Sequence, residues 1–266
     1  MRILDMNGFI SEKIKIVPLS DEEFDKLSDE LYSYFPKTKK ELKLIIEERI
    51  KKEGNKCDLN DIDTSGITDM SDLFYESKIF NGDISQWDVS NVTDMSRMFF
   101  RARSFNGDIS KWDVSNVKDM SSMFDSADSF NRDLSDWNVS NVEDMNGMFH
   151  KAISFNGDIS KWDVSKVTDM GGMFYYVKPF NGDISKWDVS SVTNMCYMFD
   201  HAESFNCDIS GWNVSRVSYM YQMFADALSF DCNLSGWDVR NVDSYKFMFQ
   251  NCPIYNQPEK QPKFRI

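Results

Sequence analysis

Hydrophobic positions along this chain recur with a period of 25 residues. Phe-Asn or Phe-Asp opens a unit at seven places without a single insertion, namely Phe80, Phe105, Phe130, Phe155, Phe180, Phe205 and Phe230. Each unit holds one tryptophan, and together the units hold all seven tryptophans of the chain. A fixed period of this length is typical of repeat proteins, in which neighbouring units bury a continuous core that one unit cannot form alone.

Within one unit, the apolar spacing differs between the two halves. Ile84, Trp87 and Val89 have the spacing of the inward positions in a leucine-rich-repeat strand. The next apolar residues follow at i, i+3, i+4 and i+7, which predicts a short helix: Met95, Met98, Phe99 and Ala102. We therefore predict an α/β solenoid, a leucine-rich-repeat-like, right-handed stack. Each 25-residue unit would contribute one short parallel β-strand and one short helix, with a small α+β cap at the N-terminus.

Two columns of polar residues accompany the apolar ones. Asparagine recurs from Asn81 to Asn206, and serine recurs from Ser85 to Ser235. Near a core, such side chains bond turn backbone or one another along the stack. A catalytic serine is the weaker alternative, because a nucleophile needs a positioned base and the chain has only two histidines, which we expect on the surface.

The repeats divide the chain into three segments. Residues 1–56 are expected to form an N-terminal cap or a small docking element, with a hairpin and two helices. Capping boxes mark the starts of these helices at Ser20 and Thr38. One partial and seven full units form the solenoid over residues 57–254, and residues 255–266 form a C-terminal tail or cap.

Composition and charge narrow the range of partners. A net charge of −13 argues against direct nucleic-acid binding, which needs clustered Lys and Arg, and instead favours a basic partner or simple solubility. No stretch approaches the roughly 18 apolar residues of a membrane span. The N-terminus has no apolar core of a signal peptide, so we expect a cytoplasmic protein. Five cysteines give no complete disulfide framework, and we expect free thiols.

The repeating unit resembles that of a known family. Residues 80–99 read FNGDISQWDVSNVTDMSRMF, and the general pattern FNGDISxWDVSNVTDMSxMF resembles the BspA-like leucine-rich repeats of bacterial surface proteins. The resemblance covers roughly residues 57–254. It implies a leucine-rich-repeat-like solenoid used for adhesion or protein binding, and it implies no catalytic residues. It also implies an alternative location, at the bacterial surface or secreted by non-classical export.

Aromatic residues on the variable side of the units mark a candidate binding surface. The positions on the expected helix side vary between units, and the later units carry aromatic residues there, with Tyr219 and Tyr221 where Asp and Ser usually stand. The candidate residues are Tyr175, Tyr176, Tyr197, Tyr219, Tyr221 and Phe247. Exposed aromatic clusters are typical of contact surfaces, so we predict that these six residues bind a partner or mediate self-association. Drift of a tolerant surface is the alternative.

No pattern in the sequence points to catalysis or to a bound cofactor. Asp83, Asp88 and Asp94 recur down the stack, but they lie on different segments, whereas Ca²⁺ needs about six to eight oxygens around one point. We expect no catalytic residue, no cofactor and no metal ion. The leading hypothesis is a non-enzymatic scaffold for adhesion or for binding a protein partner of unknown identity. The alternatives are an acidic decoy that binds a basic or nucleic-acid-binding protein and, third, an enzyme.

Overall fold

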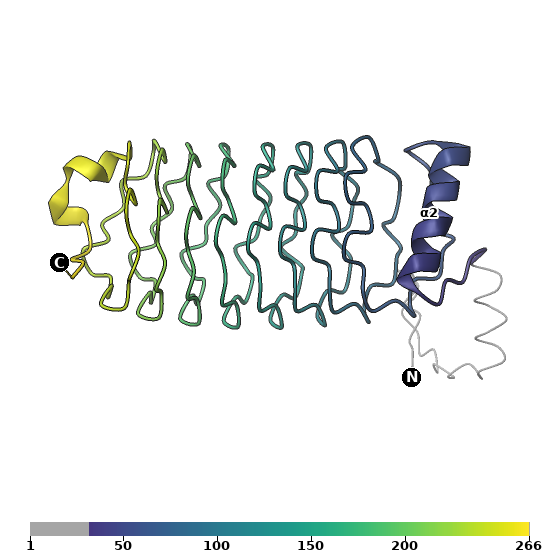
Figure 1. The fold of residues 1–266 in the computed structure, drawn as a ribbon, viewed down its shortest axis with the longest axis horizontal. Helices are drawn as coiled ribbons and strands as arrows, with labels where there is room; N and C mark the ends of the chain where they lie inside the picture. The colour runs from purple at the N-terminus through teal and green to yellow at the C-terminus, as the bar shows by residue number, and fades with distance from the viewer. Residues whose placement is uncertain (1–31, 266) are drawn as a thin grey trace, which may run out of the picture.

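The computed structural model describes residues 32–265. Figure 1 shows the repeats as similar coils stacked side by side along the long axis, with the helix α2 (Lys39–Glu53) at one end. Two short 3-10 helices, η1 (Pro253–Asn256) and η2 (Pro258–Lys260), lie at the other end. The expected hairpin and the helix beginning at Ser20 lie outside the described residues.

Each unit is built from turns and single parallel bridges. Residues 57–252 contain no helix and no extended strand. Backbone pairing consists of isolated parallel bridges between successive units, including an unbroken series from Asp69↔Asp94 to Tyr219↔Ser244. The short helix expected over residues 95–102 is therefore absent, and so is the strand expected over residues 84–89.

Consecutive turns bury the side chains that we had assigned to a helix. The N–H of Met98 donates to Met95 O at 3.2 Å, and Arg97 between them has a left-handed φ of 53°, as in a type II turn. The N–H of Met95 donates not within its own unit but to Asp119 O of the next unit, at 2.9 Å. Turns of this kind return the chain to the core every three to four residues, so their apolar spacing matches that of a helix.

The apolar columns form one continuous core. The seven tryptophans, the methionines of the two recurring columns and the phenylalanines that open each unit are at most 5 % exposed. The rings of Phe105 and Phe130 have centroids 6.0 Å apart and lie within 4° of parallel. Those of Trp162 and Trp187 are 6.2 Å apart, also within 4°. The predicted copy-over-copy alignment of these side chains is confirmed.

Polar groups near the core bond from one unit to the next. Each of the seven tryptophans donates its indole N–H to a carbonyl 28 residues earlier, at 2.9–3.2 Å. In the asparagine column, Asn81 Oδ1 accepts from the N–H of Asn106 at 2.9 Å, which confirms the predicted bonding to turn backbone. The N–H of Ser85 donates to Asp83 Oδ1 at 3.0 Å and holds the pKa of that carboxyl below its usual value.

Helix α2 covers the first unit of the stack. The Thr38 side chain accepts from the N–H of Glu41 at 3.2 Å, and the helix stops before Gly54, whose φ of 90° favours glycine. Leu42 and Ile46 on its inner side are 0 % and 2 % exposed and belong to the core. The helix start predicted at Thr38 is confirmed.

We expect Thr38→Ala to lower the free energy of unfolding by about 1 kcal/mol, because the N–H of Glu41 loses its acceptor. Urea unfolding followed by circular dichroism measures the change. Thr38→Ser keeps the hydroxyl and should unfold like the unmodified protein. An equal loss in both variants would assign the effect to the threonine methyl group instead of the cap.

The C-terminal tail takes the place of a further unit. The N–H of Leu234 donates to Lys260 O at 2.8 Å, as that of Leu134 donates to Asp158 O of its next unit at 3.3 Å. Phe264 stacks on Tyr245, with ring centroids 3.9 Å apart. The tail therefore shields the last unit from solvent, as α2 shields the first.

The cysteines are all free, as expected. Cys207 and Cys232 occupy one column in adjacent units, and each thiol faces an aspartate, with Cys232 Sγ 3.2 Å from Asp208 Oδ1. Burial and this carboxylate raise the pKa of the Cys232 thiol to about 11, so the group is an unreactive thiol at neutral pH.

Candidate functional site

Five of the six predicted aromatic residues lie together. Tyr175, Tyr176, Tyr197, Tyr221 and Phe247 form a connected file of rings, which we call the aromatic face. Centroid distances along it are 4.8 Å from Tyr176 to Tyr175 and 6.0 Å from Tyr175 to Tyr197, then 5.2 Å to Tyr221 and 5.9 Å to Phe247. Tyr219 is 50 % exposed, but no ring contact joins it to this file, because it lies in the column of bridge residues.

The backbone of the aromatic face does not favour aromatic residues. Tyr176, Tyr197 and Phe247 have φ of 58°, 59° and 60°, a left-handed conformation that costs a residue with a Cβ about 1–2 kcal/mol. Gly147 and Gly172 occupy the column of Tyr197 and Phe247 in other units, with φ of 62° and 61°. Tyr197 and Phe247 are also 38 % and 56 % exposed, so the core does not require their rings. Arg97, Ser122 and Gln222 adopt the same conformation in this column, so the left-handed turn belongs to the repeat and the exposed aromatic side chain is the departure from it.

Two histidines extend the aromatic face. The ring of His150 stacks on Tyr175 at 4.7 Å, and the ring of His201 stacks on Tyr176 at 4.0 Å, within 6° and 11° of parallel. We had expected ordinary surface histidines, but both rings are half-buried between units. Each lies one period from its tyrosine in the sequence, so the column positions contained the signal that would have predicted the stacking.

A hollow of about 600 Å³ opens beside the aromatic face. Its lining includes three glycines at positions where other units carry side chains: Gly147, Gly171 and Gly172. A Cβ on Gly171 would lie 2.7 Å from Asn194 Nδ2 and 2.8 Å from Asn146 Nδ2. Both amides donate to Asp169 Oδ1 at 3.0 Å. Residues that differ from the repeat pattern therefore gather around this hollow. Its lining contains aromatic rings and side-chain amides that form hydrogen bonds.

A column of carboxylates runs along the bridge positions next to the hollow: Asp69, Asp94, Asp119, Asp144 and Asp169. Burial, together with the charges of Asp119 and Asp169, raises the pKa of Asp144. Lys39 of α2 pairs with Asp69 at 3.0 Å at one end of the column. Asn194 continues the column without charge, so the run of carboxylates at the bridge positions ends at Asp169.

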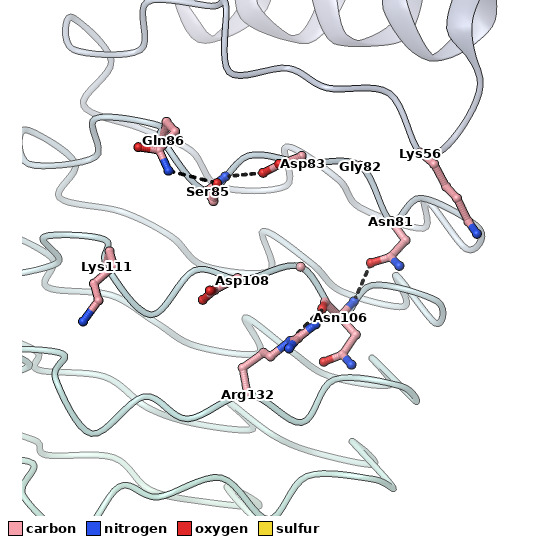
Figure 2. Close-up of a pocket in the computed structure, with 11 residues that line it drawn as sticks. Lys56, Asn81, Gly82, Asp83, Ser85, Gln86, Asn106, Asp108, Lys111 and Arg132 are labelled. Carbon is pink, nitrogen blue, oxygen red and sulfur yellow. Dashed lines mark hydrogen bonds between the residues drawn. The ribbon is translucent and has the colours of Figure 1, made fainter. Parts of the chain in front are cut away.

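A second hollow, of about 490 Å³, lies among the turns near the N-terminal end of the stack (Figure 2). Its polar groups already bond one another: Asn106 donates its N–H to Asn81 Oδ1, and Arg132 donates to Asn106 O at 2.6 and 2.8 Å. Five of its eleven lining residues belong to the recurring asparagine, aspartate and serine columns, and Gly82 and Gly107 belong to a recurring glycine position. We therefore consider it a feature of the repeat and not a specialised site.

Comparison with known proteins identifies a family over most of the chain. A family described as "Mycoplasma protein of unknown function, DUF285" matches residues 47–162 and again residues 144–261. No curated protein and no solved structure matches the chain. Within residues 32–265, no helix combines the length and the apolar character needed to cross a bilayer. The tandem matches cover the repeats and the end of α2.

Proposed function

The chain belongs to this DUF285 family, the BspA-like repeat family, and on that premise we propose that it is a non-enzymatic scaffold that binds another protein through the aromatic face. The motif FNGDISxWDVSNVTDMSxMF is the repeating unit of this scaffold in our proposal. We further propose that the stacked coils are a solenoid used in adhesion or protein–protein interaction.

One observation carries the proposal: Tyr197 and Phe247 occupy exposed, left-handed turn positions where other units have glycine or polar residues. Neither the local backbone nor the core gains from an aromatic side chain there. Interfaces, in contrast, gain most of their binding free energy from a few such residues, because a large rigid ring buries much area with little loss of conformational entropy. The neighbouring hollow offers a partner side chain a place to enter.

The proposal predicts that binding depends on the aromatic face. The full chain, immobilised, is incubated with a lysate of the organism that carries its gene. A variant with Tyr175, Tyr176, Tyr197, Tyr221 and Phe247 replaced by serine should retain a partner at least about tenfold less well than the unmodified chain.

A matched control keeps this experiment specific. Leu44→Ser with Ile79→Ser removes exposed apolar side chains, 51 % and 67 % exposed, that lie outside the aromatic face. This control should retain the partner fully, and circular dichroism should be the same for all three proteins. Equal capture by the serine variant would remove the aromatic face as the binding surface.

The acidic decoy is the second candidate function, and the carboxylate column favours it. A partner held mainly by these charges would be basic, its binding would fall steeply with salt, and DNA would compete for it. A partner held by the aromatic face should respond weakly to salt, because apolar burial does not depend on counterion release. The salt dependence of a captured complex therefore separates the two functions.

A further inference from the structure

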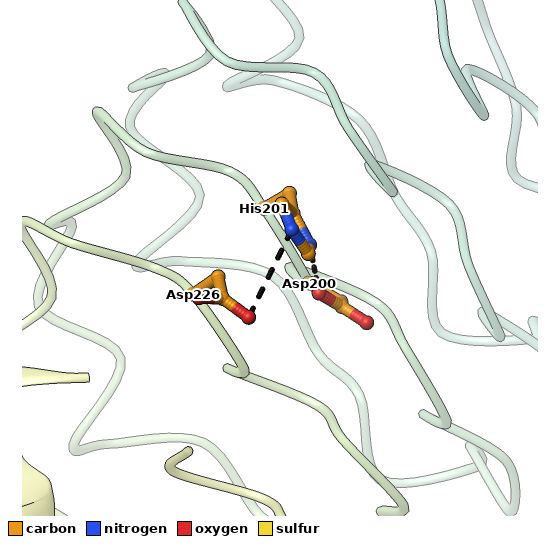
Figure 3. A group of neighbouring side chains, drawn as sticks. All are labelled: Asp200, His201 and Asp226. Carbon is orange, nitrogen blue, oxygen red and sulfur yellow. Dashed lines mark hydrogen bonds and ion pairs between the residues drawn. The ribbon is translucent and has the colours of Figure 1, made fainter. Parts of the chain in front are cut away.

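One histidine lies between two carboxylates of adjacent coils. His201 Nδ1 is 2.5 Å from Asp200 Oδ1, and His201 Nε2 is 3.8 Å from Asp226 Oδ2 (Figure 3). Each of the three residues offers a ligating atom, and these atoms lie within 4.8 Å of one another. Among residues 32–265 no other such group of three occurs.

Asp200 is the unusual member of this cluster. It is 2 % exposed and is the only buried charged residue in the part of the chain that the structure describes. Burial raises its pKa, with the opposing effect of His201 smaller. A buried carboxylate needs a cationic partner. One other unit has aspartate at this place in the column, Asp125, and the remaining units have histidine, alanine, glutamine or an aromatic residue. The fold therefore does not require an acid at this position.

The orientation of the ring matches that of a metal-binding histidine. Such a histidine usually donates one N–H to a carboxylate, which fixes the tautomer and leaves the other nitrogen for the metal. Asp200 holds Nδ1 in this way, and Nε2 is directed toward Asp226. The amide of Asn251 donates to Asp226 Oδ1 at 2.8 Å and so orients the second carboxylate. Tyr176, stacked on the imidazole, fixes the plane of the ring.

We propose that Asp200, His201 and Asp226 bind a divalent transition metal ion, with Zn²⁺ as the best match. His201 Nε2 and Asp226 Oδ2 are the direct ligands, while Asp200 orients His201. Two donors about 2 Å from a tetrahedral ion lie about 3.3 Å apart, so a small rotation of Asp226 closes the 3.8 Å gap. Nitrogen and carboxylate donors together favour Zn²⁺ over Ca²⁺ or Mg²⁺.

The proposed metal site is accessible to a partner. His201 and Asp226 are 30 % and 25 % exposed, so the remaining coordination positions face solvent on the aromatic face. Water occupies them in the isolated protein, and a donor atom from a partner can replace it. The metal site itself does not rest on the proposed function, because it follows from the geometry of three residues.

Isothermal titration of the full chain with ZnCl₂ at neutral pH tests the proposal. The background carries Cys196, Cys207 and Cys232 as serine, which removes the partly exposed thiols as competing ligands. We expect one ion per chain, an affinity about 10–100-fold lower for Asp200→Asn, and no binding for His201→Gln with Asp226→Asn. MgCl₂ and CaCl₂ should give no heat.

His150 provides a matched control, because it stacks on Tyr175 and faces one carboxylate, Asp125, at 3.1 Å. His150→Gln should leave Zn²⁺ binding unchanged. Thermal unfolding checks that every variant folds, and Zn²⁺ should raise the Tm of the background but not that of the His201 and Asp226 variant. No binding to the background, or an equal loss in His150→Gln, would overturn the proposal and leave His201 as a structural bridge between two carboxylates.

Discussion

Replacing Phe149 by alanine should lower the free energy of unfolding by about 3–5 kcal/mol, because it leaves a cavity in the middle of the stack. The Phe149 ring is 0 % exposed. Its centroid lies 3.8 Å from that of Phe155 in the following unit and 5.9 Å from that of Phe174. Alanine removes both contacts, and the neighbouring coils cannot close the gap without breaking the hydrogen bonds that join them.

Phe247→Ala is the matched control, since its ring is 56 % exposed. It should change the free energy of unfolding by less than about 0.5 kcal/mol. Urea unfolding followed by tryptophan fluorescence measures both variants, and their midpoints are compared because repeat arrays need not unfold in two states. Similar midpoints for the two variants would mean that the stacked rings do not hold the units together.

Inserting one alanine between Met170 and Gly171 should disrupt the stack much more than deleting a whole unit. Alternate N–H groups around this point donate to the next coil, such as Met170 to Asn194 O at 3.0 Å and Phe174 to Met198 O at 2.9 Å. A one-residue shift breaks these bonds, at about 0.5–1.5 kcal/mol each. It also turns Phe174 out of the core.

Deletion of residues 105–129 is the matched comparison, because it removes 25 residues and leaves every later column in register. This shorter protein should stay folded, with a lower unfolding midpoint, whereas the insertion should expose the amides around residue 171 to hydrogen exchange. Equal protection in the insertion variant would show that the coils do not depend on a fixed register.

The columns could be predicted from the sequence, whereas the secondary structure within a unit could not. Trp87, Met95 and Phe99 recur at fixed positions, and their alignment follows because only stacked copies bury them. The i, i+3, i+4, i+7 spacing of Met95 to Ala102 is equally compatible with a helix and with successive turns. The two structures differ in the acceptor of the backbone N–H groups. The acceptor of the Met95 N–H lies 24 residues later, so no pattern among neighbouring residues reveals it.

The candidate site, too, could be predicted from the sequence only in part. Tyr175 and Tyr197 could be assigned to one surface because they depart from the repeat in adjacent units. Tyr219 lies in the column of bridge residues and has no ring contact with the other five, so its part in the surface stays a prediction. The sequence predicts only a surface histidine at His201, because its contact with Asp226 joins residues 25 positions apart in adjacent coils.

The hydrogen bonds between coils have an electrical consequence. In the segment that begins at Met95, four alternate N–H groups donate to carbonyls of the C-terminal neighbour, those of Met95, Arg97, Phe99 and Arg101. The corresponding segments from Met70 to Met220 do the same. Aligned peptide groups add their dipoles, as they do along a helix axis. Other N–H groups donate toward the N-terminal neighbour, such as Thr93 to Thr68 O at 2.8 Å and Ser104 to Lys78 O at 3.1 Å, so the dipoles of the two sets oppose each other. Each coil therefore cancels part of its own polarity, and adding or removing a whole unit leaves that balance unchanged.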